Sequence, residues 1–96
     1  MTVAFKYLAP DYHGDMEIVG TGVRAYDVFA QSKFRERPEE LVESFPTCPL
    51  AAIYEAMAYA LEHPDEMEAI RRADTEVEER VLKEAQEKIR NRLALP

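Results

Sequence analysis

The spacing of apolar residues predicts short strands at the start of the chain. Segment 2–8 alternates large apolar side chains with smaller or polar ones, the period of two that is typical of a strand, with Val3, Phe5 and Tyr7 on one face. Segment 16–26 contains two short strand-like runs around Gly20-Thr21-Gly22, and glycines can take the positive φ angles of a hairpin turn. Strands this short are not stable alone, so we expect them to pack on helices or on a second chain.

From residue 27 onward the apolar positions follow a helical period instead. The first predicted helix directs three aromatic or aliphatic side chains to the core, namely Val28, Phe29 and Phe34. The second begins at Pro38, which suits a first helical turn, and two glutamates follow at the positive end of the helix dipole. Its buried face is predicted to consist of Leu41, Val42 and Phe45.

The third predicted helix, residues 50–61, is apolar on almost every side. Between residues 46 and 61 the only charged side chain is that of Glu55. A helix of this kind is usually buried, and it has more apolar surface than one small chain is expected to cover. The helix is therefore the hub of the domain or half of a dimer core, and we expect a homodimer whose core includes Ile53, Ala56, Met57 and Ala60.

The last predicted helix starts near Pro64 and continues without Gly or Pro to Leu93. It is highly charged and carries one apolar stripe, formed by Met67, Ile70, Ala73, Val77, Val81, Ala85, Ile89 and Leu93. A long charged helix with a single apolar stripe needs a surface to lie against. The later part of the stripe is a candidate partner-binding surface, consisting of Val77, Val81, Ala85, Ile89 and Leu93. Packing within the chain or within a dimer is an equally good interpretation.

Together these elements predict a mainly α fold. Its centre is a helix-turn-helix core of about four helices, with a short N-terminal β-hairpin and a long C-terminal helix. Residues 1–70 are expected to form the helix-turn-helix domain with its hairpin. Residues 71–96 are expected to form a charged helix that serves as a partner arm or packs in the dimer.

Composition narrows the classes of function. The net charge is −7, whereas a fold that binds nucleic acid through its own field is usually basic. One cysteine and two distant histidines give no metal-ligand spacing, and no carboxylate pair lies in an apolar setting that would raise a pKa. We therefore expect no enzyme, no cofactor and no metal. One cysteine and no long apolar run favour a cytoplasmic protein without a membrane span.

The helix-turn-helix outline raises the question of DNA binding. Base readout needs donors and acceptors on the third helix, and Thr47, Tyr54 and Glu55 are the only such groups nearby. A structural helix pair is therefore favoured over base-specific readout. Phosphate contacts need only positive charge. The candidates for such contacts are Arg24, Lys33, Arg35 and Arg37, and a solvated loop is an equally good interpretation of this group.

Three segments occur in the order and spacing of a known pattern: "EIVGTGVRAYDV", "RPEELVESFP" and "LAAIYEAMAYALEHPDEM". Over residues 4–70 the chain resembles the small bacterial and archaeal family catalogued as number 433 among the domains of unknown function. The resemblance implies a helix-turn-helix fold. For many members it also implies a proposed role as a VapB-like antitoxin, of the VapBC type, paired with a nuclease toxin that resembles the PIN fold. Cys48 takes an apolar position of the family and is expected in the core.

The chain departs from the family pattern at positions that bear on DNA binding. Gly22 stands where the family has an arginine, Pro49 replaces a polar cap, and Ala51 and Ala52 replace acidic or polar residues. The last three changes remove polar groups from the third helix. The resemblance therefore implies an antitoxin-like, non-catalytic protein that neutralises a cognate ribonuclease through an acidic C-terminal helix and binds its operator weakly. The alternative is a structural or protein-interaction module that binds neither DNA nor toxin.

Overall fold

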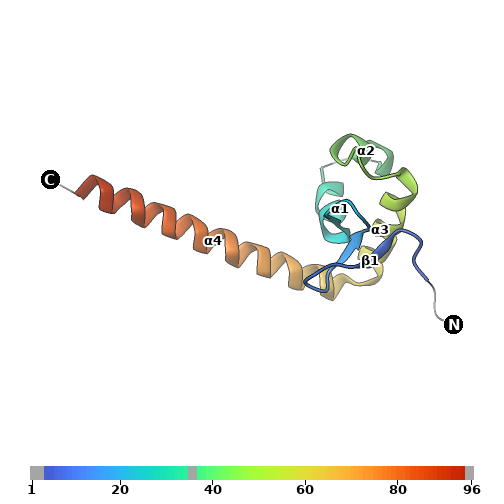
Figure 1. Ribbon diagram of the computed structural model, residues 1–96, viewed down its shortest axis with the longest axis horizontal. Coiled ribbons are helices and arrows are strands. Elements are labelled where there is room, and N and C mark those ends of the chain that lie inside the picture. Colours follow the sequence, from blue (N-terminus) through green and yellow to red (C-terminus); the bar gives the residue numbers. More distant parts are fainter. Residues whose placement is uncertain (1–3, 35–36, 95–96) are drawn as a thin grey trace. The chain divides into compact units, whose positions relative to one another are not determined.

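The structure of the chain, a computed structural model, describes residues 4–34 and 37–94. Its elements in chain order are β1 (Leu8–Pro10), β2 (Met16–Ile18), β3 (Val23–Arg24), α1 (Ala25–Ser32), the 3-10 helix η1 (Pro38–Glu40), α2 (Leu41–Ser44), α3 (Leu50–Glu62) and α4 (Pro64–Ala94) (Figure 1). The predicted mainly α fold, with strands at the start and a long last helix, is confirmed. The chain divides into two units, residues 1–64 and residues 65–96.

The three strands form one antiparallel sheet in the order β1-β2-β3. The turn between β2 and β3 holds Gly20 and Gly22 at φ angles of 78° and 75°, a region that glycine reaches without a steric penalty. The predicted hairpin is therefore confirmed. The strand predicted over residues 2–8 is wrong for residues 4–7, because β1 begins only at Leu8. Residues 2 and 3 lie outside the part of the chain that the structure describes.

The core of the first unit lies where α1 and α3 pack against each other. Val28 and Leu41 are 0% exposed and Cys48 is 3% exposed, so their predicted core positions are confirmed. Three other predicted core residues, Phe29, Val42 and Phe45, are half-buried. The prediction for Phe34 is wrong. Its side chain is 79% exposed, because α1 ends at Ser32 and Phe34 follows in the turn.

One face of α3 is buried by its own chain. Ile53, Ala56 and Ala60 are at most 1% exposed, and Met57 is half-buried. The sheet, α1 and α2 all contact α3 within the single chain. The argument that assigned these residues to a dimer core was that one chain could not cover them. That argument is wrong for Ile53, Ala56 and Ala60, because the single chain already covers them.

The segment before β1 is held against α3 at two points. The Glu55 carboxylate accepts hydrogen bonds from the backbone N–H groups of Tyr7, at 3.0 Å, and of Leu8, at 3.3 Å. The Phe5 ring meets the Tyr59 ring edge-on, with centroids 5.5 Å apart. These contacts tie the irregular segment before β1 to α3, and the Tyr7 carbonyl also accepts a hydrogen bond from the Val19 N–H at 2.9 Å.

Candidate functional site

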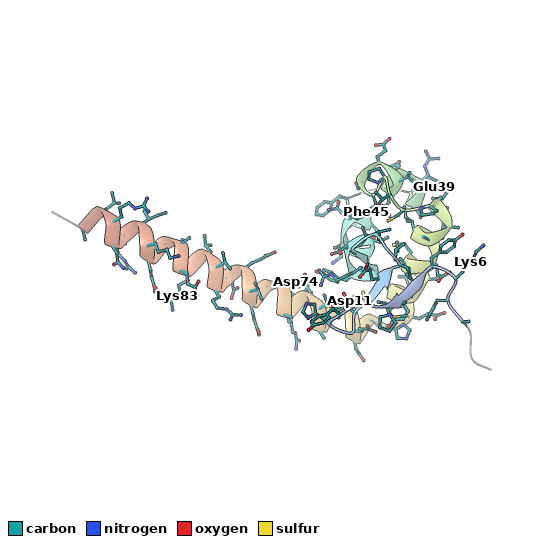
Figure 2. The ribbon with its side chains drawn as sticks, viewed as in Figure 1. Lys6, Asp11, Glu39, Phe45, Asp74 and Lys83 are labelled. Carbon is teal, nitrogen blue, oxygen red and sulfur yellow. The ribbon has the colours of Figure 1, made fainter. Side chains whose placement is uncertain are left out.

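The polar side chains near the start of α3 are used inside the chain. The Tyr54 hydroxyl donates a hydrogen bond to the Glu39 carboxylate in η1, and Glu39 lies beside α2 in Figure 2. This bond lowers the pKa of Glu39 and raises the pKa of Tyr54. Glu55 is bound to the backbone before β1, as described above. Three side chains near α3 could read bases. Within the described part of the chain, Tyr54 and Glu55 are hydrogen-bonded internally, and Thr47 is exposed and shows no such bond.

The exposed face of α3 is apolar. Its members are Leu50, Ala51, Tyr54, Ala58 and Leu61. At 3.6 residues per turn these positions fall within a sector of about 100°. The three larger side chains are 38%, 44% and 66% exposed in chain order. The face holds no Lys, Arg, Asn or Gln, which are the side chains that most often recognise bases.

Charge around the helix-turn-helix pair is unfavourable for DNA. Residues 37–62 contain one basic side chain and five acidic ones, a net charge of −4. The basic residue is Arg37, whose Nε lies 3.8 Å from Oε1 of Glu40. A phosphate backbone approaching α3 would therefore meet mostly like charge.

The candidate phosphate-binding residues do not form one cluster. Arg24 lies between two carboxylates, with Nη1 3.5 Å from Oδ2 of Asp15 and Nη2 3.0 Å from Oδ1 of Asp27. Its backbone N–H donates to Asp27 Oδ2 at 2.9 Å, a bond that fixes the start of α1. Lys33 is exposed beyond the other end of α1, about 13 Å away at 1.5 Å per residue. Arg35 lies outside the described residues. The geometry gives Arg24 a structural role, and Lys33 and Arg37 are exposed cations.

Residues 12–60 match the model of a family described as "Protein of unknown function (DUF433)". The match covers just over half of the 96 residues. The chain belongs to this family. Comparison with curated proteins and with solved structures gives no match. The DUF433 segment holds the sheet strands β2 and β3 with α1 and α2, and it ends inside α3, so α4 lies wholly beyond it.

The second candidate surface is on α4. Met67 and Ile70 at its start are buried, at 3% and 8% exposed. The predicted partner-binding residues are accessible, with exposures of 50% for Val77, 59% for Val81, 58% for Ile89 and 81% for Leu93. Ala85 is also exposed. Side chains project from α4 on every side in Figure 2, where Lys83 points away from the helix axis. Among the described helices, none has the length and apolar character needed to cross a membrane.

The partner-binding residues of α4 do not form a straight stripe. They are spaced by four residues, and a helix turns by about 100° per residue, so each step moves the row by about 40°. Between Val77 and Leu93 the row therefore turns by about 160° around the helix. A straight face that contains Val77 and Val81 continues to Ala85 and Lys88 and is preceded by Asp74. These five residues define what we term the α4 face.

The charge of α4 is divided between its two halves. Residues 65–79 hold seven acidic and two basic side chains, a net charge of −5, and residues 80–94 hold two acidic and five basic ones, a net charge of +3. The expectation of an acidic C-terminal helix is wrong for residues 71–96, which hold six acidic and seven basic side chains, a net charge of +1. Inside the acidic half, Glu68 accepts hydrogen bonds from Arg71 at 2.7 and 2.9 Å and from Arg72 at 3.2 Å. These bonds lower the pKa of Glu68 to about 2, and the bond from Arg71 has the largest effect.

Proposed function

We propose that this chain is a non-catalytic binding protein of the antitoxin type, and that α4 holds a cognate ribonuclease of the PIN-like kind. The observation that carries the proposal is the exposure of the apolar row on a helix of 31 residues. Exposed apolar side chains in a regular row mark an interaction surface more often than isolated ones do. The match to the DUF433 family supports the proposal through the antitoxin role that the resemblance to this family implies.

The two features of α4 have separate physical roles in this proposal. A ribonuclease binds an RNA backbone, so its groove is expected to be basic around the catalytic carboxylates. The acidic half of α4, residues 65–79, imitates the charge of that backbone and speeds encounter. The apolar row from Val77 onward docks beside the groove and sets the dissociation rate. Because α4 is already helical in the free chain, ordering it costs little on binding.

The proposal also includes a homodimer, a cytoplasmic location and a weak contact with operator DNA. Lys33 and Arg37 are the described cations available for phosphates, and Arg35 adds a third. Because such contacts release counterions without reading bases, binding should fall steeply with salt and differ little between operator and scrambled duplexes. A strong sequence preference that survives replacement of all three cations would contradict this part.

An inhibition assay tests the antitoxin proposal directly. A small nuclease encoded beside the gene is the partner to test, with RNA cleavage as the readout. Ending the chain at Ala69 should leave the first unit folded, by circular dichroism, and abolish inhibition. Replacing Val81 and Ile89 together by Asp should do nearly the same through faster dissociation. Lys83→Asp is the matched control, since it also makes the net charge more negative by two, and Lys83 is exposed and lies about 160° from Val81 and about 120° from Ile89.

The alternative is a protein-interaction module that binds neither DNA nor a toxin. The observation that favours it is the exposed apolar face of α3, together with the internal use of Tyr54 and Glu55. If the truncated chain inhibits the nuclease as well as the full chain, the role proposed for α4 is wrong and the nuclease-binding surface must lie on the first unit. If neither chain inhibits the nuclease, the antitoxin proposal is wrong and the alternative holds.

A further inference from the structure

We propose that α4 pairs with α4 of a second copy of this chain, antiparallel and centred on Val81. The two-fold axis then passes beside Val81, and the acidic half of each helix lies along the basic half of the other. This inference goes beyond the proposed function and does not depend on a ribonuclease. It also moves the expected dimer contact from the buried residues of α3 to the α4 face, where Val77, Val81, Ala85 and Lys88 are exposed and Asp74 is half-buried.

The division of charge along α4 is the first argument. An acidic start and a basic end would suit the dipole of an isolated helix, but that effect falls off within the first and last turns. The four acidic residues at positions 74–79 and the four basic residues at positions 80–90 lie further in. When charge changes sign near the middle of a helix, a second copy of that helix running antiparallel presents opposite charge along its whole length. A parallel pair would place acidic side chains beside acidic ones over about 15 residues, or roughly 22 Å.

The order of side chains on the α4 face is the second argument. In an antiparallel pair centred on Val81, each residue lies opposite the one at the same distance on the other side of the centre. Val77 then meets Ala85 of the second copy, so a larger side chain fits beside a small one. Asp74 meets Lys88 of the second copy, so opposite charges meet where the apolar part of the face ends. One register satisfies all of these contacts.

The flank of the face follows the same pattern. Arg80 and Glu84 lie on the same side of α4, within about 40° of each other. In the same register Arg80 comes beside Glu84 of the second copy, and the symmetry repeats the contact. Since the symmetric pair uses the same surface on both copies, assembly stops at two chains.

The pair covers part of the surface that the proposed function gives to a ribonuclease. This point rests on the proposed function. If a ribonuclease binds α4, the second copy competes with it and shields Val77 and Val81 while no ribonuclease is bound. Two crossing helices make a small interface. The dimer is therefore expected to dissociate in the micromolar range, where a tighter partner can replace the second copy.

A charge-exchange cycle on the full chain tests the pairing, with dissociation constants measured by sedimentation equilibrium. Asp74→Lys alone and Lys88→Asp alone each place like charges together at two symmetric points. Each should weaken the dimer by about tenfold. The double variant restores opposite charges in the antiparallel register and should regain most of the affinity. Residues 74 and 88 are about 21 Å apart within one helix, so recovery cannot come from a contact inside one chain.

Further variants guard against an effect on folding. The same cycle with Arg80→Glu and Glu84→Arg should give the same pattern. Because these two residues are one turn apart in the same helix, circular dichroism must show equal helix content in all variants before recovery is assigned to pairing between copies. Val81→Asp should leave only monomer, whereas Gln86→Asp should dimerise as the parent chain does. A parent chain that stays monomeric across the micromolar range would overturn the inference. So would double variants that remain as weak as the single ones, or a dimer that tolerates Val81→Asp. None of these outcomes depends on the inhibition assay.

Discussion

Replacing Glu55 by Ala should destabilise the first unit by about 2 kcal/mol. The Glu55 carboxylate accepts hydrogen bonds from the N–H groups of Tyr7 and Leu8, which lie 48 and 47 positions earlier in the sequence. A hydrogen bond to a charged group contributes about 1.5–3 kcal/mol when it is well shielded. Glu55 is only half-buried, so water partly replaces the lost acceptor, and the two bonds together are expected to contribute about as much as one shielded bond.

Urea denaturation of the full chain measures this change, and a loss of about 2 kcal/mol should lower the melting temperature by roughly 10 °C. Hydrogen exchange at the amides of Tyr7 and Leu8 should accelerate more than exchange in α1. Glu55→Gln should fall between the two, because its amide oxygen can accept both bonds without a charge. Glu62→Ala, at an exposed position of the same helix, is the matched control. If Glu55→Ala costs less than about 0.5 kcal/mol, a typical surface effect, the link between α3 and the N-terminal segment is not a stabilising one.

Other substitutions test the remaining contacts. Val28→Ala removes two methyl groups at a site that is 0% exposed and should cost about 2 kcal/mol by urea denaturation, whereas Phe34→Ala should change the free energy of unfolding by less than about 0.5 kcal/mol. Tyr54→Phe removes the hydrogen bond that lowers the pKa of Glu39, so that pKa should rise toward its ordinary value in an NMR titration. Glu68 should keep its charge until the pH approaches its pKa in the folded chain, about 2. Because folding lowers this pKa, the stabilisation that Glu68 contributes is present above its ordinary pKa and is lost as the pH falls toward 2. An ordinary pKa at either glutamate would contradict the contact described for it.

Local chemistry made most of the helix and turn boundaries predictable. Pro38 begins η1, Pro49 precedes α3 and Pro64 begins α4, because proline fixes φ near the helical value and lacks the N–H that a first turn leaves unpaired. Gly20 and Gly22 marked the β2–β3 turn in the same way. Each of these residues acts through its own backbone, so no knowledge of distant contacts was needed.

The roles of polar side chains in α3 were not predictable in the same way. Glu55 was the one charge in an apolar stretch, and its hydrogen-bond partners lie at the other end of the first unit in sequence. Tyr54 likewise bonds to a residue of a different element, Glu39. Phe34 misled because a helical period was extended past the end of α1. These outcomes depend on tertiary contacts, which override local pattern and propensity.

The size of the apolar surface on α3 misled for a related reason. A nearly uncharged helix predicts a second chain that covers it, yet the strands, α1 and α2 together cover Ile53, Ala56 and Ala60. The division of charge in α4, in contrast, was already visible in the sequence. The net charge of the whole chain, −7, hides this division, and the separate charges of residues 65–79 and 80–94 show it.

The two helices at the end of the chain therefore differ in what holds them. α3 is ordered by the core that covers one of its faces and by the contacts of Tyr54 and Glu55. α4 beyond Ile70 has mostly exposed side chains, and a helix in that position is held mainly by its own composition and by pairs such as Glu68 with Arg71. Such a helix frays in water from its free end. Any chain that lies against α4, whether a second copy or a ribonuclease, would add the tertiary contacts that the composition of α4 alone cannot supply. This is the physical reason to expect the apolar residues of α4 to be covered by a partner.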